Sequence, residues 1–311
     1  MLDLTAIILT KDEKLHIARC LERLLPLEPR RILVVDCFST DGTQEIVEHF
    51  SREERVGRVE IKVVEHDWPG NQAEQFNWAL DNCVIDTEWI LRIDADEYLS
   101  PEVVMEVKEA LPSASPDVSA YAIGRYAVWQ GRIMRHGSGK VLLTRIFRKE
   151  KGRSEVRLMD EHIVISDGKT QVLRHPFFDE NVKDFEDWTK KHLNYALREA
   201  LDLLRMEYAP SEAQSAHLNA SASAKRAKKS KYARLPLFWR SFAYFLYRYI
   251  LRGGFLDGRA GFTWNFFQGW WYRTMVDARI VEIKRATGAE QDREHAWERI
   301  CAYARERGLR I

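Results

Sequence analysis

Three carboxylates follow a short apolar run in the stretch WILRIDADEYLS, residues 89–100: Asp94, Asp96 and Glu97. Asp94 and Asp96 are two residues apart, so on a regular strand they share a face and can converge on one ligand. Two like charges about 4 Å apart repel by roughly 4 kcal/mol at an effective dielectric constant near 20. A divalent cation, Mg²⁺ or Mn²⁺, would relieve this repulsion and keep coordination positions open for phosphate oxygens. The alternative is a solvated turn in which Glu97 begins a helix near Pro101.

The chain around these acids alternates between strand and helix patterns. Short apolar runs rich in β-branched residues predict strands at 4–10, 30–36, 58–67 and 88–96. Helical patterns lie between them, at 16–25, 39–50 and 71–83. This alternation predicts an α/β fold with a parallel sheet covered by helices on both faces. Ligands of such sheets bind beyond the carboxyl ends of the strands, and the polar clusters of this sequence fall there, at 10–13, 36–42, 67–70 and 94–97.

The rest of the chain divides into a strand-rich part and a helical part. Further strands are predicted at 121–132, 139–149 and 155–168, and a charged helix is predicted at 183–206. The C-terminal stretch 275–308 has the pattern of a helical pair or of a single long helix.

Composition excludes several classes of protein. The formal net charge of +1 does not suit a polyelectrolyte binder. The four cysteines have neither zinc-ligand nor disulfide-framework spacing, which indicates reduced thiols in the cytoplasm. The N-terminus lacks the basic region and cleavage site of a signal peptide, and no window reaches the ~18 uninterrupted apolar residues of a spanning helix.

The segment 213–256 contains no acidic residue and interleaves aromatic with basic side chains. Such composition suits a nucleic acid or a membrane surface, and the chain has no nucleic-acid-binding motif. Each Lys or Arg near an anionic leaflet contributes about 1 kcal/mol, which would favour the binding of 225–252 to an anionic membrane surface. The alternative is that the aromatic side chains pack on the α/β part of the chain. The basic residues are Lys225, Arg226, Lys228, Lys229, Lys231, Arg234, Arg240, Arg248 and Arg252.

Five segments occur in an order that resembles a family 2 glycosyltransferase of the GT-A fold, an inverting enzyme with a nucleotide-sugar donor. They are IILTKDEKLHIARCLERLL, ILVVDCFSTDGTQEIV, DWPGNQAEQFNWAL, WILRIDADEYLSPEV, and LTRIFRK with MDEHIVI. The later segment RGGFLDGRAGF is similar to part of the bacterial branch that extends lipopolysaccharide cores. The resemblance implies a Rossmann-like mixed sheet in a catalytic domain at 1–182, with a nucleotide-sugar half at 1–100 and an acceptor half at 119–182. A helical region at 183–311 would follow.

The resemblance also implies roles for residues at the strand ends. The base and ribose of the donor would lie against the end of the first strand, and Asp36 would accept a hydrogen bond from the base. The family usually has Asn where this chain has Asp12. Asp96 would be the better ligand of Mn²⁺ or Mg²⁺, with Asp94 towards the ribose or the metal. The residues expected to contact the donor are Thr10, Asp12, Glu13, Asp36, Asp67, Gln72, Gln75 and Asp94.

The resemblance also implies a catalytic base about 65 residues after the acids, in RLMDEHIVI. A carboxylate there would remove the proton of the acceptor hydroxyl as it attacks the anomeric carbon. The flanking residues favour Glu161, with Asp160 second; a chance surface cluster is the alternative. Arg145 is expected to clamp phosphate. His136 is placed near the donor diphosphate, with a structural loop histidine as the alternative.

Together these features imply sugar transfer from a nucleotide-diphosphate sugar, a UDP-hexose as the commonest choice. The acceptor would be a hydroxyl of a lipid-linked or lipopolysaccharide-core glycan at the inner face of the cytoplasmic membrane. A nucleotidyltransferase is an alternative, but it normally has a Gly-rich loop after the first strand, and LTKDEKLH has no glycine. A dehalogenase-type phosphatase carries its acids on the first strand. A nucleotide-sugar-binding protein without catalysis is the remaining alternative.

Overall fold

The computed structural model describes residues 1–53, 57–157, 159, 161–210 and 231–309, which form two compact units. The first unit comprises Met1–Ile133, Lys140–Val156 and Glu161–Lys183. The second comprises Met134–Gly139 and the chain from Asp184 onwards, with a short stretch between Val156 and Glu161.

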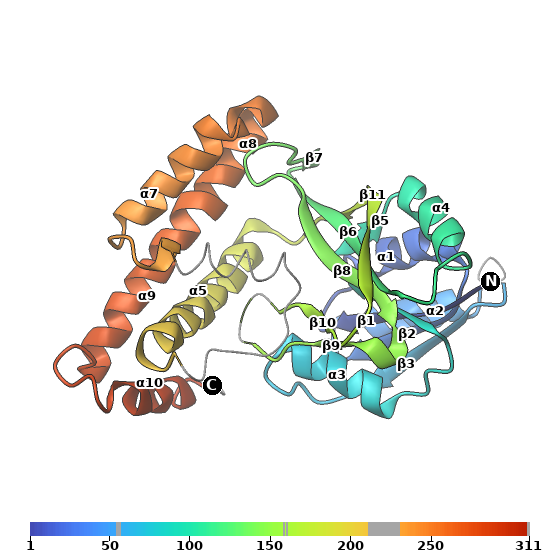
Figure 1. The fold of residues 1–311 in the computed structure, drawn as a ribbon, viewed down its shortest axis with the longest axis horizontal. Helices are drawn as coiled ribbons and strands as arrows, with labels where there is room; N and C mark the ends of the chain where they lie inside the picture. The colour runs from blue at the N-terminus through green and yellow to red at the C-terminus, as the bar shows by residue number, and fades with distance from the viewer. Residues whose placement is uncertain (54–56, 158, 160, 211–230, 310–311) are drawn as a thin grey trace. The chain divides into compact units, whose positions relative to one another are not determined.

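The first unit is built on a mixed sheet with the strand order β3-β2-β1-β4-β8-β6-β11-β5 (Figure 1). Four parallel strands form one half: β1 (Leu2–Thr10), β2 (Pro29–Asp36), β3 (Glu60–Glu65) and β4 (Trp89–Asp94). In the other half, β8 pairs antiparallel with both β4 and β6, and β11 runs parallel to β6. The strands of this half are β5 (Glu97–Leu99), β6 (Val118–Trp129), β7 (Arg132–Ile133), β8 (Val141–Arg148) and β11 (Lys169–Asp179).

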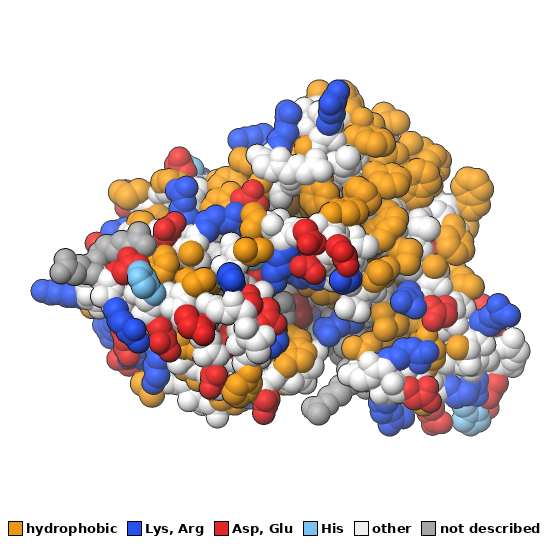
Figure 2. Space-filling view, turned by 180° about the vertical axis from the view of Figure 1, so that it is seen from behind, with side chains coloured by type: hydrophobic (Ala, Val, Ile, Leu, Met, Phe, Trp, Pro, Cys, Tyr) orange, Lys and Arg blue, Asp and Glu red, His pale blue; other side chains and the backbone are white. Residues whose placement is uncertain are grey.

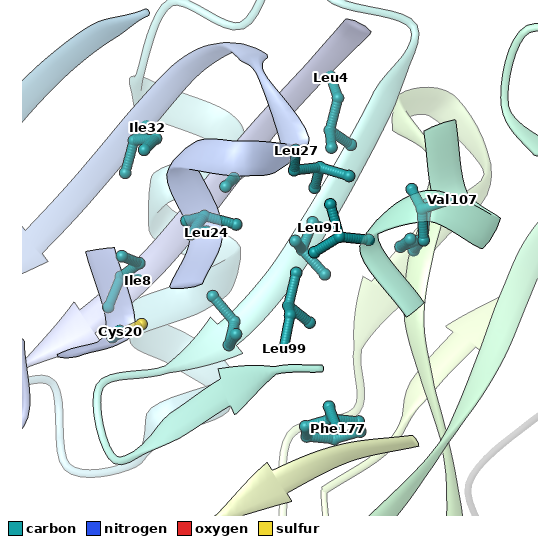
Figure 3. Close-up of a cluster of buried hydrophobic side chains, with 14 of the residues drawn as sticks. Leu4, Ile8, Cys20, Leu24, Leu27, Ile32, Leu91, Leu99, Val107 and Phe177 are labelled. Carbon is teal, nitrogen blue, oxygen red and sulfur yellow. The ribbon is translucent and has the colours of Figure 1, made fainter. Parts of the chain in front are cut away.

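Helices cover both faces of the sheet, as predicted. Alternating side chains of β1 enter different cores: Ile8 packs with α1 and α4, whereas Ile7 packs with Phe76 of α3. Figure 3 shows the first of these cores, where Leu24 of α1 and Val107 of α4 lie over the strands. The helices of this unit are α1 (Ile17–Leu24), α2 (Thr43–Ser51), α3 (Gln72–Asn82) and α4 (Pro101–Ala110), with a short 3-10 turn η1 (Leu25–Leu27) after α1.

The parallel register gathers the polar strand ends at one edge of the sheet. Thr10 is paired with Asp36 on β2, and its neighbour Leu9 is paired with Asp94 on β4. Because β1 lies between β2 and β4, the residues that follow these three strands surround one region. The predicted clustering at the carboxyl edge is therefore confirmed for the parallel half.

The structure does not support the alternative in which Glu97 begins a helix. Glu97 lies in β5, and α4 begins at Pro101 after Ser100, whose hydroxyl accepts the Val103 amide as an N-cap. The strand predicted at 155–168 is too long: among the residues of this stretch that the structure describes, the strand is β10 (Ile163–Ile165), which pairs with β9 (Gly152–Ser154) after a 3-10 turn η3 (Lys149–Lys151). The long β11 was not predicted, because its polar pattern has no strand period and its pairing with β6 is non-local.

The second unit is helical, with α5 (Phe185–Tyr208) packed on α9 (Tyr272–Thr287) and α10 (Ala296–Arg305). Gly288, at φ 59°, ends α9 in the left-handed region, so the C-terminal stretch is a helical pair. Among the described residues, no helix combines the length and apolarity needed to cross a membrane. The intervening elements are α7 (Trp239–Leu246), η4 (Tyr247–Leu251), η5 (Gly254–Asp257), α8 (Gly258–Trp264) and η6 (Asn265–Trp271), of which η4 and η6 are π-helical.

His192 of α5 is a buried histidine in the second unit. It stacks on Trp188 at 3.7 Å, its Nδ1 lies 2.7 Å from the Trp188 carbonyl oxygen, and its Nε2 lies 2.7 Å from Nε2 of Gln268. Burial lowers the pKa of His192 to about 4, although the Trp188 carbonyl opposes the fall. The unfolded chain therefore binds a proton between pH 6.5 and 4 that the folded chain excludes, which costs roughly 3 kcal/mol of stability at pH 4.

We expect the full stability to be present above about pH 6.5 and to decline as the pH falls towards 4. His192→Gln should remove most of this dependence, measured as the free energy of unfolding at pH 7 and pH 4. The exposed His295 of the same unit provides the control His295→Gln. An unchanged pH dependence in His192→Gln would show that other groups cause the acid sensitivity.

Candidate active site

Polar groups at the ends of β1 and β2 form a hydrogen-bonded cluster around Asp36. Thr10 Oγ1 donates to Asp36 Oδ1 at 2.7 Å, and the Ser39 amide and Gln44 Nε2 each donate to Oδ2 at 2.7 Å. Burial opposes ionisation of Asp36, but these hydrogen bonds outweigh it and hold the pKa below its usual value. Asp36 is fully buried. A nucleobase can therefore hydrogen-bond to Asp36 only if one of these three donors moves away from the carboxylate.

Asp12 and Glu13 shape the loop that follows β1. Asp12 has φ 53°, a left-handed conformation that Asp and Asn adopt more readily than most residues, and its Oδ1 accepts the Thr40 amide at 2.9 Å. Glu13 accepts from two sides, with Oε2 2.6 Å from His16 Nδ1 and Oε1 3.1 Å from Lys183 Nζ. The structure thus brings together Thr10, Asp12, Glu13 and Asp36, as the sequence predicted.

The residues between β3 and α3 do not all face the same region. Asp67 is exposed, and Gln72 is partly buried at the start of α3. Gln75 is fully buried: its Oε1 lies 2.7 Å from His66 Nδ1, and its Nε2 donates to Cys37 Sγ at 3.2 Å. Gln75 therefore ties α3 to the ends of β2 and β3, and its predicted contact with the donor is not available in this structure.

The acids after β4 lie among arginines. The Asp94 side chain is partly exposed, with Oδ2 3.5 Å from Arg145 Nη2 and Oδ1 3.8 Å from Arg92 Nε. Asp96 follows in the turn and is also partly buried. Arg145 was predicted to clamp phosphate, but it is buried, and its Nη2 bonds Glu97 as well as Asp94. In this structure Arg145 compensates carboxylates.

Glu97 is the central residue of this acid cluster, and no role was predicted for it. It is 1% exposed, and its Oε2 accepts the Asp94 amide at 3.0 Å. Its Oε1 accepts from Arg145 Nη2 and lies 3.9 Å from Arg125 Nη1, which is also 3.0 Å from Asp179. Burial raises the pKa of the Glu97 carboxyl, while Arg145 opposes the rise. The hydrogen bond to the Asp94 amide fixes the turn that carries Asp94 and Asp96.

These contacts change the interpretation of the acid cluster. The sequence suggested that a metal ion is needed to relieve repulsion between Asp94 and Asp96, but Arg92, Arg125 and Arg145 already offset the charge of the cluster. Within the described residues, no group of three or more His, Cys, Asp or Glu could hold a metal. Asp94 and Asp96 are both partly exposed, and one or two such carboxylates would suit a cation that takes its remaining ligands from phosphate and water, as Mg²⁺ does.

Glu97→Gln is expected to lower turnover and metal affinity by about 10- to 100-fold, the usual cost of losing a residue that orients a metal ligand. The amide keeps the shape of Glu97, but its nitrogen cannot accept a hydrogen bond, so the bond from the Asp94 amide or the bond from Arg145 is lost. Turnover and Mn²⁺ titrations measure the effect, with Glu106→Gln on α4 as the control; Glu106 bonds the amides of Arg174 and His175 instead. Equal Mn²⁺ titrations for the two variants would contradict this role.

The predicted base lies beside a two-stranded ribbon that is anchored to β4. Glu161 is partly buried and stands two residues before Ile163 of β10, which pairs with Ser154 of β9. Arg92 Nη1 donates to Ser154 Oγ at 3.0 Å, and Asn77 of α3 bonds the backbone of Ser154 at 2.8 and 2.9 Å. Arg92 thus joins the strand of Asp94 to the ribbon beside Glu161, while Asp160 lies outside the described residues.

His136 belongs to the second unit. Its Nδ1 lies 2.8 Å from Asp257 Oδ1, and its amide donates to Asp257 Oδ2 at 2.8 Å. His136 is therefore held by the segment RGGFLDGRAGF, and its place near the donor diphosphate stays a prediction.

Arg92, Arg125 and Asn77 contact residues of the candidate site, but they were not predicted as site residues because their sequence signals are weak. Arg92 precedes Asp94 by two positions and so shares its face on β4, and this spacing is a sequence signal for a contact between the two. Arg125 and Asn77 have no local signal, because their partners lie on other elements.

Four parallel strands with acids at their carboxyl ends, continued by a mixed half with a buried arginine cluster, define an α/β fold of the GT-A type. The family model described as glycosyl transferase family 2 matches residues 5–180, and the chain belongs to that family. Among solved structures, it is similar to the mannosyltransferase PcManGT from Pyrobaculum calidifontis in complex with GDP-Man and Mn²⁺. The TM-score is 0.53 at 16% identity, covering 90% of this chain and 87% of that one, which establishes the likeness of fold.

Two curated relatives come from Rickettsia. The chain is 31% identical over 131 residues to the uncharacterized glycosyltransferase RC0292 of Rickettsia conorii, which is 42% of this chain and 39% of that protein. It is 32% identical over 131 residues to an uncharacterized glycosyltransferase of Rickettsia felis, with the same shares. The chain thus spans about two-fifths of the length of the curated relatives it matches.

Proposed function

We propose that this chain transfers a sugar, with inversion, from a nucleotide-diphosphate sugar to a hydroxyl group of a glycan. The observation that carries the proposal is the register at the sheet edge, where Thr10 is paired with Asp36 and the adjacent Leu9 with Asp94. A nucleoside bound over the ends of β1 and β2 has its diphosphate directed to the end of β4, next to Asp94 and Asp96. UDP-hexose is the proposed donor.

Asp96, with Asp94 beside it, is the proposed protein contribution to a Mn²⁺ or Mg²⁺ site. When bound, the cation would neutralise charge on the diphosphate of the departing nucleotide. The protein holds this turn through the bond from the Asp94 amide to Glu97 and through the flanking arginines. The mannosyltransferase from Pyrobaculum calidifontis, which has a similar fold, was solved with GDP-Man and Mn²⁺, and this supports the choice of a divalent cation.

Glu161 is the proposed general base. As the acceptor hydroxyl attacks the anomeric carbon, Glu161 takes its proton and the bond to the nucleotide diphosphate breaks with its electron pair on the leaving oxygen. Asp160 is the alternative base. The ribbon of β9 and β10 supports the role of Glu161, because Arg92 links it to the strand that carries Asp94.

The proposed acceptor is a lipid-linked or lipopolysaccharide-core glycan, and the proposed location is the inner face of the cytoplasmic membrane. The acid-free segment that continues to Leu256 and the following RGGFLDGRAGF support this assignment. The most basic part of the predicted membrane segment, 225–230, lies outside the described residues.

The proposal is tested by incubating the protein with UDP-, GDP- and dTDP-sugars and Mn²⁺, and measuring nucleotide release and thermal protection. We expect one nucleotide-sugar to raise the unfolding temperature only when Mn²⁺ is present, and to be turned over when a glycan acceptor is added. Chelation of the metal is the control. Absence of both protection and release across the panel would refute the proposed donor class.

A further inference from the structure

The second unit exposes an area of apolar side chains around η4, η5 and α8. We call this area the apolar surface and define it by six residues at least 45% exposed: Tyr247, Ile250, Leu251, Phe255, Leu256 and Phe262. Tyr249 joins its parts, because its ring lies 6.3 Å from that of Phe255 and 5.6 Å from that of Phe262. Figure 2 shows a broad gathering of hydrophobic side chains over the part of the molecule that carries α7 and α8 in Figure 1.

Several apolar side chains in and beside this surface are strongly exposed. Leu251 is 77% exposed and Leu256 is 56% exposed, and Trp239 at the start of α7 is 73% exposed. Single exposed apolar residues are common, but a contiguous area of large aliphatic and aromatic side chains marks an interaction surface.

The charged side chains of the chain segment that carries the apolar surface are almost all of one sign. Residues 231–273 contain seven Lys and Arg and one acid, Asp257, which is buried and bonded to His136. The exposed cations are Lys231, Arg234, Arg252 and Arg259. No exposed carboxylate lies in this stretch, all of which the structure describes. The charges of this segment favour a partner that is anionic as well as apolar.

The structure also corrects the predicted number of membrane-facing cations. Arg240 is buried in an ion pair with Asp277, with Nε 2.8 Å from Oδ1. Arg248 is buried as well. Neither arginine can reach a lipid headgroup, so the contribution of this region depends on apolar contact more than the sequence suggested.

We propose that the apolar surface inserts into the interface of an anionic lipid bilayer. Aliphatic side chains such as Leu251 and Leu256 would enter the boundary of the acyl chains, and Trp239 and Tyr247 suit the headgroup region. Arg252 and Arg259 would bond lipid phosphates. No described helix is long and apolar enough to span the bilayer, so the surface lies on the membrane.

This inference deepens the proposed function, since it assigns the surface that would bring the chain to a lipid-linked acceptor. Membrane binding through the apolar surface differs from electrostatic attraction by a basic segment alone in its dependence on salt concentration. Salt screens charges on an exposed surface over about 8 Å at physiological ionic strength, but it does not weaken apolar contact. Binding through the apolar surface therefore persists in part at high salt.

The test is co-flotation of the full chain with vesicles of phosphatidylcholine and phosphatidylglycerol, at low and high salt. Each of Leu251→Ser and Leu256→Ser is expected to weaken vesicle binding by about tenfold, and the double variant by more. The matched control is Val281→Ser, which removes a 44% exposed aliphatic side chain from α9 of the same unit. Thermal unfolding of the variants checks that these surface changes leave the fold intact.

The possible outcomes separate this inference from its alternatives. Wild-type vesicle binding by the double variant, or complete loss of binding by the wild type in high salt, would overturn it. Concentration-dependent self-association that the double variant loses, without vesicle binding, would assign the surface to a second copy of the chain and equally overturn it. Asp96→Asn is expected to bind vesicles normally, so failure of the proposed sugar transfer would leave this inference standing.

Discussion

Asp96→Asn is expected to lower the rate of sugar transfer by about a thousandfold, because the variant loses the carboxylate proposed to hold the cation at the diphosphate. The change is nearly isosteric, and Asp96 is only partly buried, so the fold should be retained. Affinity for Mn²⁺ in the presence of nucleotide should fall with the rate, which calorimetry and turnover at increasing Mn²⁺ measure together.

The control for this prediction is Asp86→Asn. Asp86 is an exposed aspartate of the same unit that pairs with Arg31 at 3.2 Å. Asp86→Asn should leave the rate of sugar transfer and the affinity for Mn²⁺ unchanged. Near-normal turnover and Mn²⁺ affinity in Asp96→Asn would remove Asp96 from the metal site and direct attention to Asp94.

Glu161→Gln is expected to lower kcat by a factor of about 10² to 10⁴, the range attributed to a positioned general base. The amide keeps the size of the side chain but cannot take the proton of the acceptor hydroxyl. The base acts on the acceptor, so the thermal protection given by nucleotide-sugar and Mn²⁺ should stay as in the wild type. A loss of kcat without a loss of donor binding is therefore the expected signature.

Asp160→Asn, one residue earlier, is the matched comparison for the base. A small effect in Asp160→Asn beside a large one in Glu161→Gln supports the proposed assignment. The reverse result would make Asp160 the base, and two small effects would exclude both carboxylates from proton transfer. These outcomes need only single-turnover measurements with a glycan acceptor.

The arginine cluster should make folding of the first unit independent of a divalent cation. Arg92, Arg125 and Arg145 offset the charge of Asp94, Glu97 and Asp179 before any cation arrives. Folding should therefore not depend on a divalent ion, whereas donor binding should. Breaking such a buried pair by removing one partner is costly, because it leaves the other charge uncompensated.

The sequence by itself determined the parallel half of the sheet and the order of the acids along it. Apolar runs with β-branched residues, helical spacing and capping residues such as Ser100 are local signals, and each acts within a few residues. The four parallel strands and the loop cluster of Thr10, Asp12 and Asp36 could be predicted for this reason.

Only the tertiary structure decided what surrounds the acids and which side chains are accessible. Arg145 meets Glu97 across 48 residues of sequence because β8 pairs antiparallel with β4, and no local pattern encodes that pairing. Likewise, Gln72 and Gln75 share a helical spacing, yet packing against His66 and Cys37 buries Gln75 alone. Burial and charge compensation depend on which elements meet, so they appear only when the whole chain is folded.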